Sequence, residues 1–159
     1  MNKITILGSG TSTGVPILGC KCQVCQSNDV RNKRLRTSAL LETKQAKTIL
    51  IDASPDLRTQ LLTTKTDKLD AVIITHDHAD HTHGIDDVRP YTFGRKEALP
   101  VFTDQYSIDS LTKKFPYIFQ RDTVYAHKPI IGGGIPLLDL HLVQNQIVGE
   151  EFQFFPLPH

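Results

Sequence analysis

Four of the seven histidines lie close together, in the segment THDHADHTHG at residues 75–84. Within it, His76, His78, Asp80 and His81 form the pattern H-x-H-x-D-H. Because alternate residues of an extended loop point the same way, His76 and His78 can bind one metal ion. Asp80 and His81, after a turn, can face a second ion. Neutral imidazoles and a carboxylate suit zinc, manganese or iron, and two such ions about 3.5–4 Å apart can hold a hydroxide and clamp a phosphoryl oxygen.

The alternative for this segment is a histidine-rich surface loop that binds metal adventitiously. Its context favours a site, because it directly follows the buried strand pattern DAVIIT at residues 70–75. Loops at the ends of such strands commonly build the sites of α/β folds. Three further histidines, His83, His127 and His141, have no ligand spacing, and we expect their side chains to be solvated.

The three cysteines are clustered as C-x-C-x-x-C at Cys20, Cys22 and Cys25. This spacing brings three thiolates around one point, which suits a tetrahedral zinc ion that takes its fourth ligand from elsewhere. The alternatives are a Cys22–Cys25 redox pair with a spare thiol, or plain surface thiols. Three clustered cysteines do not make a secreted disulfide framework, which needs pairs spread along the chain. We therefore expect a reducing, cytoplasmic location.

Length and composition are those of an ordinary globular protein. The chain has 159 residues, of which 39% are hydrophobic and 22% charged, so we expect one domain over residues 1–159 and no general disorder. The formal net charge of +1 does not indicate an electrostatic interaction with nucleic acid. The longest apolar runs are only a few residues, which predicts no transmembrane helix and no signal peptide.

Strands and intervening helices are predicted along the chain, the pattern of a layered α/β fold. One helix is predicted to begin at Ser54, which can cap it, with Pro55 in its first turn. Asp104 is predicted to cap a later helix. The expected strands are residues 3–7, 38–42, 48–52, 70–75, 99–102, 123–126, 136–143 and 151–157, and the expected helices are residues 54–63, 84–88 and 104–115.

The H-x-H-x-D-H pattern resembles the signature of the metallo-β-lactamase superfamily. That resemblance implies an α/β fold of the αββα sandwich type, with a binuclear metal site between its two sheets. Asp52, at the end of the strand TILID, matches an earlier aspartate of the superfamily that helps to order the metal loop. His159, at the end of FFPLPH, matches the next histidine of the superfamily, a ligand of the metal held by His76 and His78.

The N-terminal segment narrows the resemblance. Residues 8–16, GSGTSTGVP, are followed by the cysteine cluster, as in the branch of the superfamily that contains phosphoribosyl 1,2-cyclic phosphate phosphodiesterase. In that branch the cysteines hold a structural zinc, which implies this role for Cys20, Cys22 and Cys25. The branch continues past the match to His159, with a bridging Asp, a final His for the second metal and a late His for the structural zinc. We therefore expect the N-terminal portion of such an enzyme or a chain completed by a partner, with a homodimer as the expected assembly.

The resemblance implies a metal-dependent hydrolase, most specifically a phosphodiesterase that acts on a small cyclic phosphate ester through a metal-bound hydroxide. The implied ligands of two divalent ions, zinc or manganese, are His76, His78, Asp80, His81 and His159. Asp80 is also the expected catalytic residue, and Asp52 orients the loop. The 159-residue chain alone is expected to be inactive. Arg34, Arg36 and Arg89 could contact phosphate or be solvated surface charges.

Two other functions are compatible with the same motifs. A tRNA 3′-processing endonuclease of this fold shares the histidine pattern and a similar N-terminal loop, but it would not be expected to carry the cysteine cluster. Such an enzyme should also need a basic surface, which the net charge does not suggest. A non-catalytic metal-binding module is the third possibility.

Overall fold

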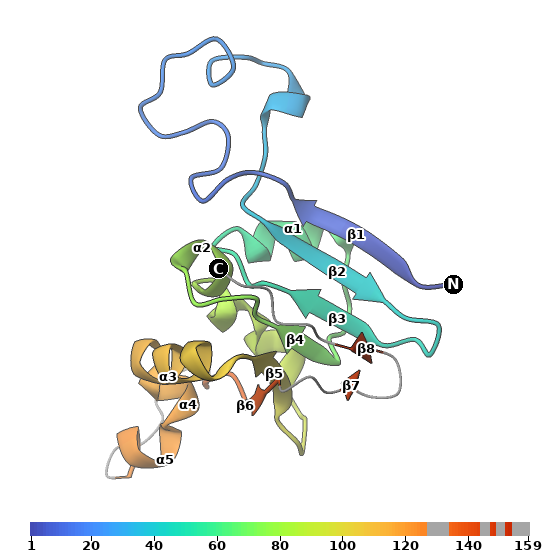
Figure 1. Cartoon of the computed structure of the whole chain (residues 1–159), viewed down its shortest axis with the longest axis vertical. Helices are drawn as coiled ribbons and strands as arrows, with labels where there is room; N and C mark the ends of the chain where they lie inside the picture. Colours follow the sequence, from blue (N-terminus) through green and yellow to red (C-terminus); the bar gives the residue numbers. More distant parts are fainter. Residues whose placement is uncertain (127–133, 144–146, 149–151, 154–159) are drawn as a thin grey trace.

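A six-stranded sheet is the main element of the computed structural model, which describes residues 1–126, 134–143, 147–148 and 152–153 (Figure 1). Neighbouring strands follow the order of the chain, β1-β2-β3-β4-β5-β6. The strands are β1 Lys3–Gly8, β2 Ser38–Glu42, β3 Thr48–Ile51, β4 Ala71–Ile73, β5 Leu99–Thr103 and β6 Leu138–Leu142. A separate antiparallel pair joins β7 Ile147–Val148 to β8 Phe152–Gln153.

The sheet changes from antiparallel to parallel across its width. β1, β2 and β3 pair antiparallel, whereas β3, β4, β5 and β6 pair parallel. The carboxyl ends of the parallel strands therefore meet at one edge of the sheet. Asp52 directly follows β3, and Thr75 lies just beyond β4, so both lie at this edge.

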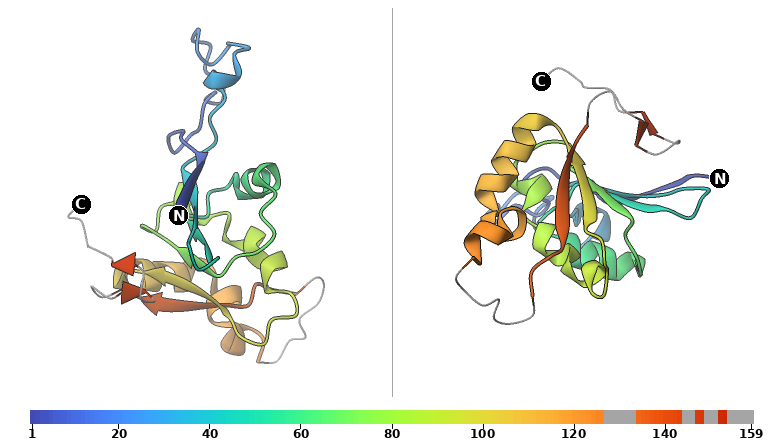
Figure 2. Two further views of the ribbon diagram at one scale, coloured as in Figure 1. Left: turned by 90° about the vertical axis from the view of Figure 1, so that its right-hand side faces the viewer. Right: turned by 90° about the horizontal axis from the view of Figure 1, so that it is seen from below.

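Helices cover one face of the sheet. They are α1 Leu57–Thr64, α2 Ala79–Thr82, the 3-10 helix η2 Ile85–Thr92, α3 Gln105–Lys114, α4 Pro116–Phe119 and α5 Arg121–Val124. Leu50, Val72 and Val101 from the strands share one buried cluster with Leu57 of α1 and Leu111 of α3. Figure 2 shows the β7–β8 pair on the side of the sheet away from α1. The predicted α/β layering is confirmed, and we call the sheet with its helices the body.

The start of α1 differs from the prediction, whereas the cap of α3 agrees with it. α1 begins at Leu57 rather than at Ser54, because the Ser54 hydroxyl accepts a hydrogen bond from the Asp56 backbone N–H at 3.2 Å and closes a turn ahead of the helix. In α3, the Asp104 side chain accepts a hydrogen bond from the Ser107 backbone N–H at 2.8 Å, as a cap does.

The edge strand expected over residues 123–126 is wrong. Its first two residues form the second half of α5 and the next two a turn, and the Val124 backbone N–H bonds the Gln120 carbonyl at 2.9 Å. These local hydrogen bonds outweigh the strand preference of the Thr and Val side chains. Of the strand expected over residues 151–157, only Phe152–Gln153 lies within the described residues, as β8. No helix in the described part of the chain is long and apolar enough to cross a membrane.

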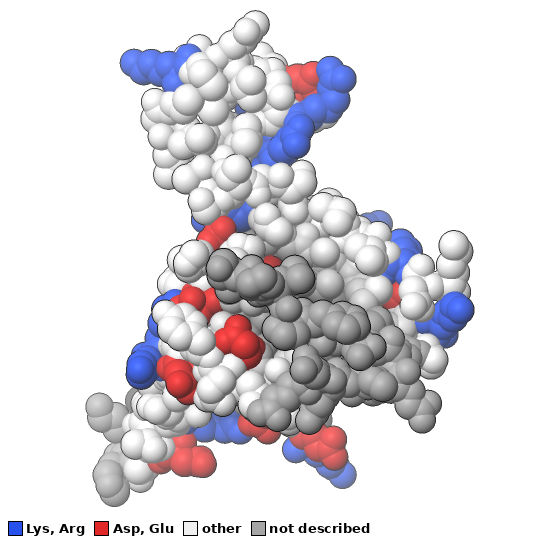
Figure 3. Space-filling view, in the orientation of Figure 1, with Lys and Arg blue, Asp and Glu red and all other residues white. Residues whose placement is uncertain are grey.

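Residues 9–37 leave the body between β1 and β2 and project from it as an arm (Figures 1 and 2). At the base of the arm, a Cβ on Gly8 would lie 2.0 Å from the Arg36 carbonyl oxygen, so the two strands of the base need glycine there. The Arg36 guanidinium bonds the Asp56 carboxylate at 2.6 and 2.9 Å, which ties the base to the body. Lys and Arg side chains lie on the outer part of the arm (Figure 3).

Candidate metal centre

Asp52 ties together the three segments that build the candidate centre. It follows β3 in the left-handed conformation, with a φ of 60°, and only 2% of its surface is exposed. Its Oδ1 accepts a hydrogen bond from the Thr75 backbone N–H at 2.8 Å, and its Oδ2 lies 2.7 Å from His81 Nδ1. A buried carboxylate needs such partners, because an unpaired buried charge is costly. The end of β3 thereby holds the end of β4 and the helix α2 in place.

The rings of His76 and His78 converge. His76 Nε2 and His78 Nδ1 are 3.1 Å apart. Two nitrogens that bind one zinc ion at about 2.0–2.1 Å in tetrahedral geometry lie roughly 3.3–3.4 Å from each other. The separation is close to that of two ligands of one ion, and the same pair can share a hydrogen bond when no ion is bound.

Thr75 determines which ring nitrogen of His76 is protonated. The unprotonated nitrogen is the one that faces the cluster. Its Oγ1 lies 3.0 and 2.9 Å from the two Asp52 oxygens and 3.0 Å from His76 Nδ1. A hydroxyl has one proton, so when Thr75 donates to the carboxylate it accepts from His76 Nδ1–H. The lone pair that can bind a metal is then on His76 Nε2, the nitrogen that faces His78 Nδ1. Sequence analysis missed this role, and the available signal was a hydroxyl residue directly before the first histidine of the pattern.

Asp80 and His81 form a second pair of converging groups, within α2. His81 Nε2 lies 3.3 Å from Asp80 Oδ2, and the ring centroids of His76 and His81 are 4.1 Å apart. Because Asp52 occupies His81 Nδ1, the other nitrogen of His81 is the one presented to Asp80. Carboxylates commonly orient metal-binding histidines in this way. The two pairs are therefore adjacent, as two neighbouring ligand sets would be.

Burial lowers the pKa of His76, and positive charge on His81 and His78 lowers it further, against a smaller opposite effect of Asp52 and Asp80. His76 is consequently neutral at pH 7, and neutral imidazole is the form that binds metals. Two imidazoles next to a histidine–aspartate pair offer the donor types that suit a divalent transition-metal ion.

The other predicted histidines lie apart from this cluster or outside the described residues. His159 and His127 are outside the described residues. His83 is exposed, with its ring 5.5 Å from that of Phe115, and His141 is exposed, with its ring 5.3 Å from that of Phe102.

The cysteines form a second cluster, in the arm. Their Sγ atoms lie within 4.8 Å of one another, and all three thiols are free. The Cys25 backbone N–H bonds Cys22 Sγ at 3.4 Å, and this bond, with the Cys20 and Cys25 thiols, lowers the pKa of Cys22 to about 7. Cys22 is therefore about half thiolate at pH 7, and the thiolate is the form that binds zinc. Within the described residues the cluster offers three donors to a tetrahedral ion, Cys20, Cys22 and Cys25.

The three candidate phosphate-binding arginines already bond groups of the protein. Arg36 pairs with Asp56, Arg34 Nε donates to the Arg31 carbonyl at 3.2 Å, and Arg89 donates to the Gly134 carbonyl at 3.0 Å. A phosphate contact would have to compete with these bonds, and for all three it stays a prediction.

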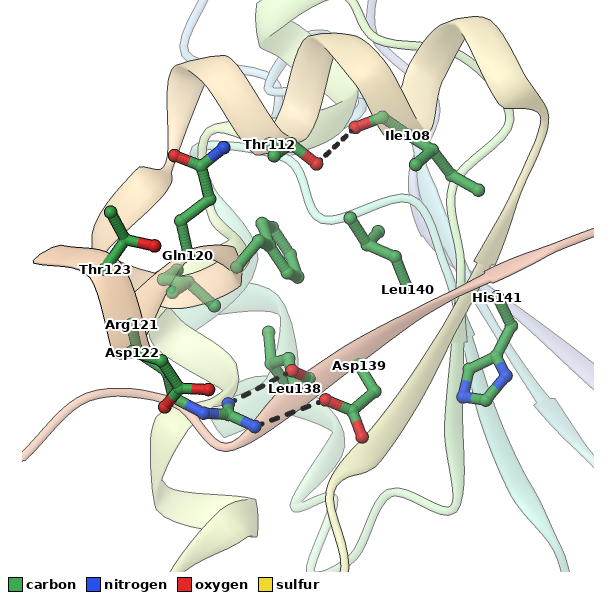
Figure 4. Close-up of a pocket in the computed structure, with 12 residues that line it drawn as sticks. Ile108, Thr112, Gln120, Arg121, Asp122, Thr123, Leu138, Asp139, Leu140 and His141 are labelled. Carbon is green, nitrogen blue, oxygen red and sulfur yellow. Dashed lines mark hydrogen bonds and ion pairs between the residues drawn. The ribbon is translucent and has the colours of Figure 1, made fainter.

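A pocket of about 750 Å³ lies between α3, α4, α5 and β6 (Figure 4). Arg121 spans it with bonds of 3.3 Å to the Leu138 carbonyl and 3.3 Å to Asp139, while Ile118 lies among its apolar lining. None of the residues of the H-x-H-x-D-H pattern lines this pocket. It is therefore separate from the candidate metal centre.

Comparison with known proteins places the chain in a family. Residues 47–159 match the family model of the beta-lactamase superfamily domain. An octanoyltransferase of Porphyromonas gingivalis is 47% identical over 126 residues, which are 79% of this chain and 25% of that protein. A coenzyme PQQ synthesis protein B of Rhodopseudomonas palustris is 38% identical over 66 residues, 40% of this chain and 21% of that protein. The chain thus spans a quarter or less of these two relatives, so their names describe much longer proteins.

Solved structures agree with this assignment. A diphosphatase from the PhnP family has a TM-score of 0.77 and 37% identity, and the match spans 92% of this chain and 52% of the chain of that protein. The zinc-bound PqqB of Methylobacterium extorquens has a TM-score of 0.67 at 20% identity, over 92% of this chain and 47% of its own. The short form of human tRNase Z has a TM-score of 0.52 at 18% identity, over 73% of this chain and 40% of its own, and these last two show the fold alone. The chain therefore belongs to the β-lactamase superfamily and has the metallo-β-lactamase fold, of which it spans about half.

Proposed function

We propose that this chain carries the first metal-binding segment of a metal-dependent phosphodiesterase that acts on a small cyclic phosphate ester. The observation that carries the proposal is the pair of adjacent contacts, His76 with His78 and Asp80 with His81, of which the second is anchored to the buried Asp52. The likeness to a diphosphatase from the PhnP family, at 37% identity, supports chemistry at phosphorus. The net charge of +1 favours a small substrate over nucleic acid.

In this proposal each side chain has a defined task. His76 and His78, with His159, would hold one divalent ion, zinc or manganese, and Asp80 and His81 would hold the second. Such ions, when bound, polarise a phosphoryl oxygen and lower the pKa of a coordinated water. Asp52 favours the His81 tautomer that is protonated at Nδ1 and, through Thr75, favours the same tautomer of His76, so that in both rings Nε2 carries the lone pair.

The cysteine cluster has a structural task in the same proposal. Cys20, Cys22 and Cys25 would hold one zinc ion and stiffen the arm. A homodimer and a cytoplasmic location complete the proposal, and sedimentation analysis of the full-length protein tests the assembly.

The test compares substrates on the full-length protein loaded with zinc or manganese. A ribose 1,2-cyclic phosphate, bis(p-nitrophenyl) phosphate, and a precursor tRNA are offered in parallel, with His76→Ala and His81→Ala as inactive controls. We expect the cyclic phosphodiester to have the highest kcat/KM. Cleavage of the precursor tRNA alone would instead identify a processing endonuclease, and metal binding without any turnover would identify a binding module.

Hydrolysis of a diphosphate is the second candidate function. It is favoured by one observation, the diphosphatase named in the 37% identical structure. Adding a nucleoside diphosphate derivative to the same assay distinguishes the diphosphatase from the phosphodiesterase. A diphosphatase would have a much higher kcat/KM for the phosphoanhydride than for the cyclic ester.

A further inference from the structure

We infer that α3 positions the first histidine pair through Asp77, the residue between His76 and His78, so that Lys114 and Ser110 tune metal binding without contacting the metal. Asp77 Oδ2 accepts hydrogen bonds from Ser110 Oγ at 2.5 Å and from Lys114 Nζ at 2.7 Å. Lys114 Nζ also donates to the Asp77 backbone carbonyl at 2.6 Å. The inference rests on the proposed metal centre.

The geometry of an extended segment explains why this contact matters. When His76 and His78 point to one side, the residue between them points to the other. Fixing the Asp77 side chain therefore fixes the direction in which both imidazoles project. The Asp77 carbonyl belongs to the peptide that leads into His78, so the second bond from Lys114 also sets the orientation of that peptide.

The loop is held from two sides. On the side of the sheet, Asp52 bonds Thr75, and within the loop itself the Thr82 hydroxyl of α2 bonds the His78 carbonyl at 2.9 Å. On the opposite side, the ion pair between Lys114 and Asp77 is partly shielded, because the Asp77 side chain is only 16% exposed. Without the second support, the distance between the two coordinating nitrogens would depend on the first support alone.

The support itself is well fixed. Ser110 and Lys114 are four residues apart and share one face of α3. Leu111 of the same helix is fully buried in the core, and Asp104 caps the start of the helix. A displacement of Asp77 would therefore have to break its bonds rather than move the helix.

The alternative role of Lys114 is to stabilise α3 alone, because a basic residue in the last turn interacts favourably with the helix dipole. Lys113 lies beside it, is exposed and has the same position relative to that dipole. Lys113→Met is therefore the matched control: it removes the same charge from the same turn and leaves the bonds to Asp77 intact.

The test is a Co²⁺ titration of the full-length protein and of the variants K114M, K114R, S110A and K113M. Absorption separates the two clusters, because cobalt bound by thiolates gives strong charge-transfer bands that cobalt bound by nitrogen and oxygen lacks. At the histidine centre we expect K114M to weaken binding by about 10-fold or more, the range found for groups that orient metal ligands. S110A should weaken it less, K114R should restore most of the affinity, and K113M should leave it unchanged.

Thermal unfolding of the metal-free variants is measured alongside the titration, to show whether each variant folds. Equal affinity of wild type and K114M at the histidine centre overturns the inference and leaves the proposed centre standing. The same loss in K113M and K114M also overturns it, because the effect would then belong to the helix. A wild-type protein that binds no cobalt at its histidines overturns both proposals. If K114M does not fold, the comparison of S110A with wild type decides the inference by the same criteria.

Discussion

The two candidate metal clusters are assembled in opposite ways. The cysteines lie within six positions of the sequence, and the hydrogen bonds to their sulfurs come from the arm itself. The histidine cluster depends on Asp52 after β3, on Thr75 after β4 and on the parallel pairing of these strands. The cysteine cluster can therefore form wherever its local turns form, whereas the histidine cluster requires the folded body. Perturbing each cluster should consequently change different properties of the molecule.

The largest effect is expected from Asp52→Asn. Asparagine tolerates the left-handed backbone at this position, so the substitution removes the charge and one acceptor without new backbone strain. The amide cannot accept from both His81 Nδ1 and Thr75, and we expect metal affinity at the histidine centre to fall by about 10–100-fold. Calorimetric zinc titration measures this loss, and zinc binding by the cysteines should not change.

The control for Asp52→Asn is Asp67→Asn, an exposed aspartate of the body. The metal affinity of this variant at both clusters should equal that of the wild-type protein. If Asp52→Asn also binds normally at the histidines, the buried carboxylate does not orient them.

A pair of glycine substitutions compares the two regions next. A Cβ on Gly84, which follows α2, would lie 1.9 Å from the Ser54 carbonyl oxygen, whereas a Cβ on Gly19 in the arm would meet nothing within 4 Å. Gly84→Ala must push backbone apart and should cost about 3 kcal/mol of unfolding free energy, the upper part of the range for overpacking. Gly19→Ala causes no such clash. Its only cost is the strain of an alanine at a positive φ of 74°, which should reduce the stability of the arm by about 1 kcal/mol.

Urea unfolding followed by circular dichroism measures both variants. Metal binding at the histidines should weaken in Gly84→Ala and stay unchanged in Gly19→Ala. If Gly84→Ala and Gly19→Ala destabilised the body equally, the arm and the body would not be energetically separate.

The parts of this molecule that sequence predicts well are those with local signals. Alternating or continuous apolar runs gave the strands, and the spacing of His76 and His78 gave their shared direction. The role of Asp52 came from a family resemblance, because no local pattern links it to His81, 29 positions away. The bonds of Ser110 and Lys114 to Asp77 span 33 and 37 positions and have no sequence signature. Local propensity also misjudged residues 123–126, where short helical turns prevailed over β-branched side chains.

A pH effect is expected at the junction of arm and body. Three hydrogen bonds from Arg36 reach the Asp56 carboxylate, and those from its side chain are the main cause of the lowered pKa of Asp56. Because the pKa in the folded state lies below that in the unfolded state, the carboxylate stabilises the fold above about pH 4, and this contribution is lost as the pH falls through the folded value. We expect about 1–2 kcal/mol, since both side chains are mostly buried.

The measurement is the difference in unfolding free energy between wild type and Asp56→Asn at a series of pH values. The difference should be largest near neutral pH and shrink toward pH 2, while Asp67→Asn should track wild type throughout. A difference that stays constant with pH would mean that the charge on Asp56 does not contribute to the junction.

The smallest effect on the body is expected from replacing all three cysteines, in the variant C20S/C22S/C25S. A hydroxyl is a poor zinc ligand beside a thiolate, so elemental analysis of the full-length protein should find one zinc fewer per chain. Because the cluster bonds within the arm and the arm is tied to the body through Arg36 and Asp56, the unfolding free energy of the body should change by less than about 0.5 kcal/mol. Metal affinity at the histidine centre should stay within about twofold of wild type, the change expected for sites without shared partners. An unchanged zinc content would exclude the cysteines as a zinc site, and a loss of histidine-centre affinity as large as that of Asp52→Asn would show that arm and body form a single cooperative unit.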